Sequence, residues 1–265
     1  SKAEEDECDR IATELKDFYG LDLSSEKTIQ GIKNEYRDVP TSVTNQLAPS
    51  AWTIRELRAL EEAASYYAPI LGSKRDESTL SSSVQGVTSI GKLKNAIDED
   101  EVTGELDDTT LGEQFSSTKN VGLFETGTND TDKNFIRPGK KKTDVQTSLT
   151  ATSIHEMAHA LVQPLELSNW VRTLDYWKDR NTKSGKWRAE KPPTSYGKES
   201  AAEDLCESVA LYFINAATLK KKCPLRFAFV DRVVKGWKPA QKSTVVSTSA
   251  STSGSESRTP SSDTK

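Results

Sequence analysis

The chain has 265 residues, of which 34% are hydrophobic and 29% are charged, and its formal net charge is −4 at pH 7. This composition suits one soluble domain of about 200 residues with additional segments. The charge shows no basic surplus, which argues against nucleic-acid binding, and no apolar stretch is long enough to span a membrane. Three scattered cysteines, Cys8, Cys206 and Cys223, are too few for a disulfide framework.

The first 48 residues predict two short helices. Ile11, Leu15 and Phe18 recur at helical spacing before a glycine, which indicates one amphipathic helix. A second, weaker helix is expected over residues 26–36. We therefore expect residues 1–48 to form an N-terminal helical extension that precedes the main domain.

The next helix is predicted over residues 52–67. Leu57, Leu60 and Ala64 share one face of it, and Ser50 is the expected N-cap because serine side chains accept hydrogen bonds from helix N-termini. This helix should pack behind a sheet.

Strands are expected next. Hydrophobic residues at positions 84, 87 and 90 predict one strand, and residues 121–125 predict another, after an acidic, turn-rich segment. The second strand has two interpretations. It is an ordinary strand of the sheet, or it is an edge strand above the active site that pairs with an extended peptide.

The two histidines of the chain, His155 and His159, lie four positions apart around Glu156, in the pattern H-E-x-x-H. On a helix both imidazoles face the same side, so they can bind one zinc ion beside a carboxylate that serves as general base. Chance produces this pattern in about one such sequence in a thousand. Candidate N-caps precede the run and Pro164 follows it, which predicts a helix here; the candidates are Thr147, Ser148, Thr150, Thr152 and Ser153.

A hydrolytic zinc site needs a third protein ligand, and with no further histidine a carboxylate is expected. Residues 196–213 predict a buried helix that carries acidic side chains. Glu203 and Glu207 lie one turn apart on it, which suits a ligand and an acid that orients a metal-bound histidine. Asp204 is the alternative ligand, although it lies about 100° further around the helix.

Tyr196, Glu203 and Glu207 follow the H-E-x-x-H helix at spacings of seven and four residues. This arrangement resembles the anthrax lethal factor-like peptidases, a gluzincin group that includes the Pro-Pro endopeptidases. The resemblance covers residues 147–216. It implies a zincin-like α+β fold, zinc ligation by His155, His159 and Glu203, and a general base at Glu156. It also implies that Tyr196 stabilises the oxyanion and that Glu207 orients a ligand.

Taken together, the sequence predicts an α+β fold with a zincin-like metallopeptidase domain at residues 49–240, in which a small twisted sheet packs on the H-E-x-x-H helix and a C-terminal helix supplies the third ligand. The expected function is zinc-dependent hydrolysis of a polypeptide substrate, in a toxin or effector protease. The alternative is a structural or interaction module, for example virion-associated, that binds zinc without turnover.

Tyr196 has an alternative interpretation, as a residue that only packs against its neighbours.

Three other segments of the chain leave questions open. Residues 165–193 include Trp170, Trp177 and Trp187 and have no counterpart in the family. Residues 241–265 are rich in serine and threonine, which predicts a disordered tail. The chain starts without a signal-peptide pattern, which is compatible with secretion after processing or with delivery into a target cell.

Overall fold

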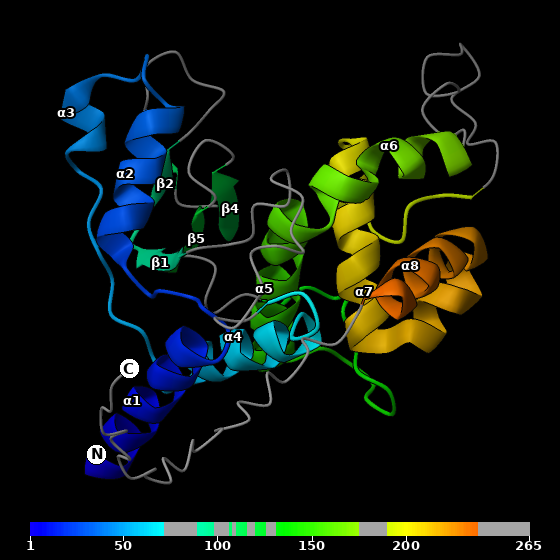
Figure 1. Cartoon of the computed structure of the whole chain (residues 1–265), viewed down its shortest axis with the longest axis horizontal. Helices are drawn as coiled ribbons and strands as arrows, with labels where there is room; N and C mark the ends of the chain where they lie inside the picture. The colour runs from blue at the N-terminus through cyan, green and yellow to red at the C-terminus, as the bar shows by residue number, and fades with distance from the viewer. Residues whose placement is uncertain are drawn as a thin grey trace, which may run out of the picture.

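In the computed structural model the fold is α+β, with eight α-helices and a small three-stranded mixed sheet in the part of the chain that is described (Figure 1). This confirms the predicted α+β class, whereas the zincin-like fold stays a prediction. The described residues are 1–71, 89–97, 106–107, 110–115, 120–125, 131–174 and 190–237. The predicted tail of residues 241–265, Trp177 and Trp187 lie outside them.

Three helices form the N-terminal part: α1 (Lys2–Asp17), α2 (Ser25–Glu35) and α3 (Thr41–Thr44). Ile11 and Leu15 are fully buried and belong to the same hydrophobic cluster as residues of α4 and α5. Phe18, which the spacing placed on the same face, is 59% exposed, because α1 ends at Asp17 and the chain turns at Gly20, whose φ is 72°. The predicted boundary at residue 48 stays a prediction.

Helix α4 (Ile54–Tyr66) confirms the predicted helix, but its N-cap is Thr53 and not Ser50. The Thr53 hydroxyl accepts a hydrogen bond from the Glu56 backbone N–H, and the Glu56 carboxylate accepts one from the Thr53 N–H. This reciprocal pair satisfies two N–H groups at the start of the helix. The Glu56 carboxylate also pairs with Lys92 of the sheet at 2.8 Å, which ties α4 to the strands.

The sheet has the strand order β1-β5-β4, with β1 (Ser89–Leu93) parallel and β4 (Gly112–Phe115) antiparallel to β5 (Asn120–Phe124). Ile90 pairs with Val121 in one ladder, and Gly112 pairs with Leu123 in the other. A separate two-stranded ladder joins β2 (Ala96–Ile97) to β3 (Leu106–Asp107). The predicted strand at residues 121–125 is thus present as β5, but it is the central strand and not an edge strand.

Alternation along β5 places its two faces in two different cores, because successive side chains of a strand point in opposite directions. Val121 and Leu123 pack in the large cluster with α4 and α5. Phe124 packs in a smaller cluster with Ile32 of α2. The sheet is therefore covered by α2 on one face and by the α4–α5 pair on the other.

Helix α5 (Val145–Leu161) runs through the centre of the molecule (Figure 1). The predicted N-caps at residues 147–153 are wrong: Asp144 caps the helix by accepting a hydrogen bond from the Thr147 N–H at 2.8 Å, so these residues lie inside it. The helix ends before Pro164, as predicted. Most of its residues are buried, as expected for a helix surrounded by other elements.

Three further helices follow: α6 (Gln163–Leu174) and α7 (Ala201–Lys222) pack against α5, and α8 (Pro224–Gly236) packs on α7. Ser200 caps α7 by accepting a hydrogen bond from the Glu203 N–H. A short 3₁₀ turn, η3 (Tyr196–Lys198), precedes it. In the described part of the chain, no helix is both long and apolar enough to cross a membrane.

Candidate metal centre

The two histidines of α5 and an acid of α7 meet where the two helices pack against each other. His155 Nε2 lies 2.9 Å from Glu203 Oε2 and 3.0 Å from His159 Nε2. His159 Nε2 lies 3.2 Å from the same Glu203 oxygen. All three side chains lie largely out of solvent, and they form the group of possible metal ligands found among the described residues. The structure therefore brings together the three ligands predicted from the sequence.

The outer nitrogen of each imidazole faces an acceptor. His155 Nδ1 lies 2.9 Å from Glu207 Oε1, and His159 Nδ1 lies 2.5 Å from Gln163 Oε1. Both acceptors favour the tautomer that carries its proton on Nδ1, so each neutral ring presents a lone pair at Nε2. Two nitrogen lone pairs and one carboxylate oxygen then converge on one point. Such a set of donors repels itself unless a cation lies between them.

The geometry fits zinc. A zinc ion bound at about 2.0–2.1 Å from each ligand atom of a tetrahedral site holds those atoms about 3.3 Å apart. The three separations here are 2.9, 3.0 and 3.2 Å, so a small outward movement accommodates the ion. One oxygen and two imidazole nitrogens also match the donor types that zinc takes in hydrolytic sites.

The charges of the site stabilise this arrangement. Burial raises the pKa of Glu203, but when both imidazoles are protonated at Nε2 their hydrogen bonds to the carboxylate outweigh burial and lower that pKa to about 2. For His155, burial lowers the pKa, and the contacts with Glu203 and Glu207 reverse this and raise it well above its ordinary value. The carboxylates thus hold a positive charge at this point, whether it is carried by protons or by a metal ion.

Glu207 and Gln163 orient the two histidines from outside the cluster. Glu207 was predicted for this role, and the structure places it on His155. Gln163 was not predicted. It is the first residue of α6 and lies four positions after His159, so the one-turn spacing that pairs His155 with His159 is the sequence signal that could have revealed it.

Glu156 lies beside the cluster and against strand β4. Its side chain is buried, and burial raises the pKa of its carboxyl group, because a low-dielectric environment disfavours the charged form. A Cβ atom on Gly112 would lie 2.8 Å from Glu156 Cγ. Only glycine therefore lets β4 approach this closely, and the strand backbone confines the carboxylate.

Tyr196 lies at the rim of the site. Its side chain is 56% exposed, and its ring centroid lies 5.8 Å from that of His155. Burial of the hydroxyl end and the neighbouring carboxylates raise the pKa of Tyr196, so the phenol keeps its proton and can donate a hydrogen bond. Tyr196 is not one of the buried or partly buried residues of the large apolar cluster.

Asp204, the alternative third ligand, points away from the histidines. Both of its oxygens accept hydrogen bonds from the Arg226 guanidinium of α8, at 2.8 and 2.9 Å. Its side chain is fully buried in this ion pair. The choice of Glu203 over Asp204 as the residue beside the histidines agrees with the structure.

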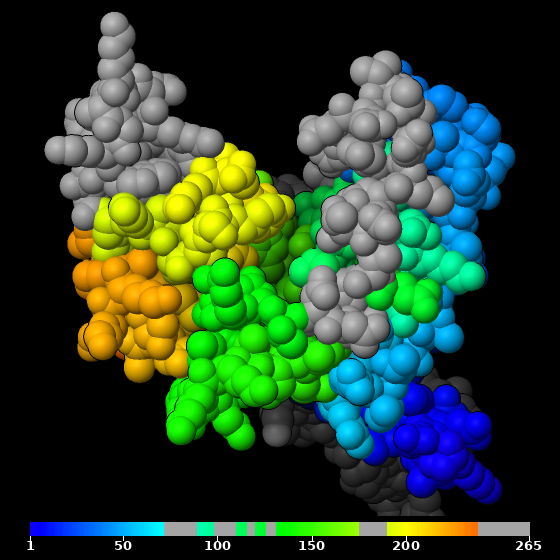
Figure 2. Space-filling model, turned by 180° about the vertical axis from the view of Figure 1, so that it is seen from behind, coloured from blue at the N-terminus to red at the C-terminus, as the bar shows by residue number. Residues whose placement is uncertain are grey.

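A cavity of about 350 Å³ opens in front of the cluster, with His155, Glu156 and Tyr196 in its wall. Seen from behind, the surface is hollowed between the yellow segment that starts near residue 190 and the sheet side of the molecule (Figure 2). Among the described strands β4 is at the edge of the sheet, and Gly112 at its start lines this cavity. The substrate-pairing role expected for residues 121–125 would therefore fall to β4.

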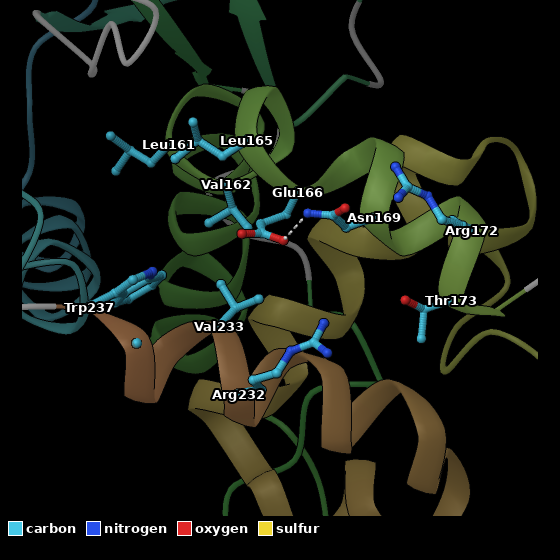
Figure 3. A pocket seen from close by; sticks show the side chains of 11 residues that line it. Leu161, Val162, Leu165, Glu166, Asn169, Arg172, Thr173, Arg232, Val233 and Trp237 are labelled. Carbon is cyan, nitrogen blue, oxygen red and sulfur yellow. Dashed lines mark hydrogen bonds between the residues drawn. The ribbon is translucent and has the colours of Figure 1, made fainter. Parts of the chain in front are cut away.

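A larger hollow of about 540 Å³ lies between α6 and α8 (Figure 3). Arg172 and Arg232 flank it, and Trp237 closes one side. None of the predicted metal or catalytic residues lines it. Size alone thus does not identify the candidate site, which is recognised by the chemistry of its groups.

Comparison of the chain with protein-family models, with curated proteins and with solved structures returned no match. The assignment of a function therefore rests on the residues and geometry described above.

Proposed function

We propose that this protein is a zinc-dependent endopeptidase with a zincin-like fold. The observation that carries the proposal is the convergence of His155 Nε2, His159 Nε2 and Glu203 Oε2, which lie within 3.2 Å of one another. A general base candidate, Glu156, lies on the same helix and lines the adjoining cavity. A three-ligand zinc site that opens on a cavity is typical of catalytic rather than structural zinc.

The chain's own residues would divide the reaction among them. His155, His159 and Glu203 would hold the zinc ion, which when bound supplies Lewis acidity for a water molecule and for the substrate carbonyl. Glu156 would take a proton from the attacking water and pass it to the leaving nitrogen. Tyr196, which keeps its proton, would donate a hydrogen bond to the oxyanion. The edge of β4 that faces away from β5 would align an extended peptide beside Glu156.

A zinc-binding module without turnover is the alternative from a different class of protein. It predicts the same metal content but needs neither a buried base nor an open cavity. The contact between Gly112 and Glu156 favours the enzyme, because the close approach of β4 holds an ionisable group beside the metal ligands and not in the packed core.

Replacing Glu156 with glutamine should abolish most peptide cleavage while zinc stays bound. The variant keeps the size of the side chain but cannot accept a proton, so the rate should fall by about a hundredfold or more. Both proteins would be incubated with a diverse peptide library, and the products read by mass spectrometry together with the zinc content.

Two outcomes would contradict the proposal. No cleavage by the zinc-loaded parent protein would favour the binding module. Cleavage that is equally fast in the Glu156→Gln variant would assign the products to a contaminant. The cleaved sequences also provide the first test of the toxin or effector interpretation, because they identify candidate target proteins.

Replacing Tyr196 with phenylalanine should lower kcat by about tenfold to a thousandfold and leave KM and zinc content nearly unchanged. Loss of one oxyanion donor removes an interaction that forms only in the transition state. Because Tyr196 is exposed, the fold should not be affected. Steady-state kinetics on one identified substrate would measure this, and full activity would make the tyrosine a surface residue.

A further inference from the structure

Part of the wall of the cavity beside the candidate metal ligands has no role in the proposed mechanism. Besides His155 and Glu156, the cavity is lined by Asp132, Phe135 and Ala151. Its volume of about 350 Å³ exceeds what a water molecule and a peptide carbonyl occupy. A side chain of the substrate next to the scissile bond would therefore fit in the same cavity.

The charge of this cavity is negative. Asp132, Glu156 and Glu207 line it, and no lysine or arginine is found among its described lining residues. With Glu203, four carboxylates face the two positive charges of one zinc ion, so the site stays acidic after metal binding. Glu207 Oε2 is buried without a hydrogen-bond partner within the described structure. An uncompensated buried carboxylate oxygen favours a cationic neighbour.

Asp132 is held in place by the protein. Its Oδ1 accepts hydrogen bonds from the backbone and side-chain N–H groups of Asn134, both at 2.8 Å, and its own N–H donates to Ser148 Oγ at 2.8 Å. These contacts fix the carboxylate at the cavity wall. For Oδ2, the described residues provide no hydrogen-bond partner, which leaves it available to a ligand.

The walls between the metal and Asp132 suit an aliphatic stem. Phe135 is 3% exposed and Ala151 is 1% exposed, so both present apolar surface to the cavity that they line. Lysine and arginine combine a hydrocarbon stem with a charged head, and they bury the stem while the head stays paired. An acidic side chain here would meet several carboxylates without a counter-charge.

On these grounds we infer that this cavity is a subsite for a lysine or arginine side chain next to the scissile bond, with Asp132 as the residue that determines this specificity. The inference rests on the proposed peptidase function and specifies its substrate class: peptides with a basic residue at the cleaved bond.

The test compares three hydroxamates, which bind zinc directly, with lysine, norleucine or glutamate as the residue adjacent to the hydroxamate. Affinities for the zinc-loaded full chain would be measured by calorimetry. The lysine compound should bind roughly tenfold more tightly than the norleucine compound, and the glutamate compound more weakly than both. Asp132→Asn keeps the contacts to Asn134 and should remove the advantage of lysine. Asp132→Lys should reverse the order of lysine and glutamate.

Lys133 provides the matched control, since it is an exposed neighbour that does not line the cavity. Lys133→Gln should leave all three affinities unchanged. Equal affinities in the parent, no binding of any compound, or a preference for lysine that survives in Asp132→Asn would each overturn the inference. Cleavage of peptides without a basic preference would overturn it and leave the peptidase proposal standing. Selective binding without any cleavage would support the subsite and contradict the peptidase proposal.

Discussion

Zinc affinity is expected to fall by at least about a thousandfold when His155 is replaced with alanine. Loss of an outer residue that only orients a ligand already lowers metal affinity by about ten to a hundredfold, and loss of a ligand lowers it further. Only His159 and Glu203 would remain, and two ligands hold the ion poorly. Metal analysis after dialysis and competition with a chelator measure the change. The parent protein should keep one zinc ion per chain.

Two acids near the start of α7 provide a second test and its control. Glu203→Ala should lose zinc as His155→Ala does, because its oxygen lies within 3.2 Å of both histidines. Glu199→Ala should retain it, because Glu199 is exposed and lies outside the cluster. Circular dichroism of each variant separates loss of the site from loss of the fold. Stoichiometric zinc in either His155→Ala or Glu203→Ala would contradict the ligand assignment.

The convergence of the candidate metal ligands could be predicted because its information is local. His155 and His159 belong to one helix, and the one-turn spacing determines that they share a face. The prediction of Glu203 as the third ligand needed one further assumption: that a buried helix with acidic residues packs against the helix that carries the two histidines. The seven-residue spacing from Tyr196, which resembles that of the lethal factor-like peptidases, favoured Glu203 over Asp204. The physical reason why Asp204 does not lie beside the histidines is its ion pair with Arg226. That partner lies 22 residues away on another helix, so no local pattern reveals it.

The strands were harder to predict in detail. The hydrophobic run at residues 121–125 identifies a strand, but its place in the sheet depends on its neighbours. The sequence at Gly112–Phe115, with one glycine and two polar residues, gives little strand signal. Its pairing with β5 and the close approach of Gly112 to Glu156 form only in the tertiary structure. For that reason the sequence left residues 121–125 with two interpretations, an ordinary strand or an edge strand, and among the described strands β5 is central with β1 and β4 at the edges.

Helix ends show a similar limit. Ser50, Thr53 and several residues at 147–153 are all acceptable N-caps by type. Thr53 is selected by its reciprocal contact with Glu56, and Asp144 by its contact with Thr147. In the second case the candidate caps lie inside α5, and the hydroxyls of Thr147, Ser148 and Thr150 are buried and bond to other groups. Thr150 Oγ1, for example, donates to the Gln146 carbonyl one turn earlier.

Replacing Arg226 with methionine is expected to lower the free energy of unfolding by about 3–5 kcal/mol, the cost of removing one partner from a buried ion pair. Arg226 is fully buried. It donates to both oxygens of Asp204 and to the Glu190 carbonyl at 3.0 Å, and it lies over the Trp170 ring. The variant leaves the Asp204 carboxylate and the Glu190 carbonyl without this donor. Urea denaturation followed by tryptophan fluorescence measures the change.

The pH dependence distinguishes the ion pair from simple packing. Burial raises the pKa of Asp204 to about 6, against an ordinary value of 3.8, although Arg226 lowers it. Without Arg226 the pKa should rise further, so the folded variant binds a proton that the unfolded chain does not. An acid with a raised folded-state pKa stabilises the fold at low pH and loses that contribution as pH rises. The destabilisation should therefore be larger at pH 8 than at pH 5.

A second substitution and an exposed control complete the test. Arg226→Met combined with Asp204→Leu should recover much of the lost stability, because apolar replacement of both partners of a buried pair is often neutral. Arg58→Met breaks the exposed pair with Glu7, whose side chains are 53% and 34% exposed, and should cost less than about 1 kcal/mol. Equal costs for Arg226→Met and Arg58→Met would contradict the role of the buried pair. Equal costs would also leave the orientation of Asp204, away from the candidate metal ligands, without an explanation. A carboxylate that is not held by Arg226 could compete with Glu203 for the histidines.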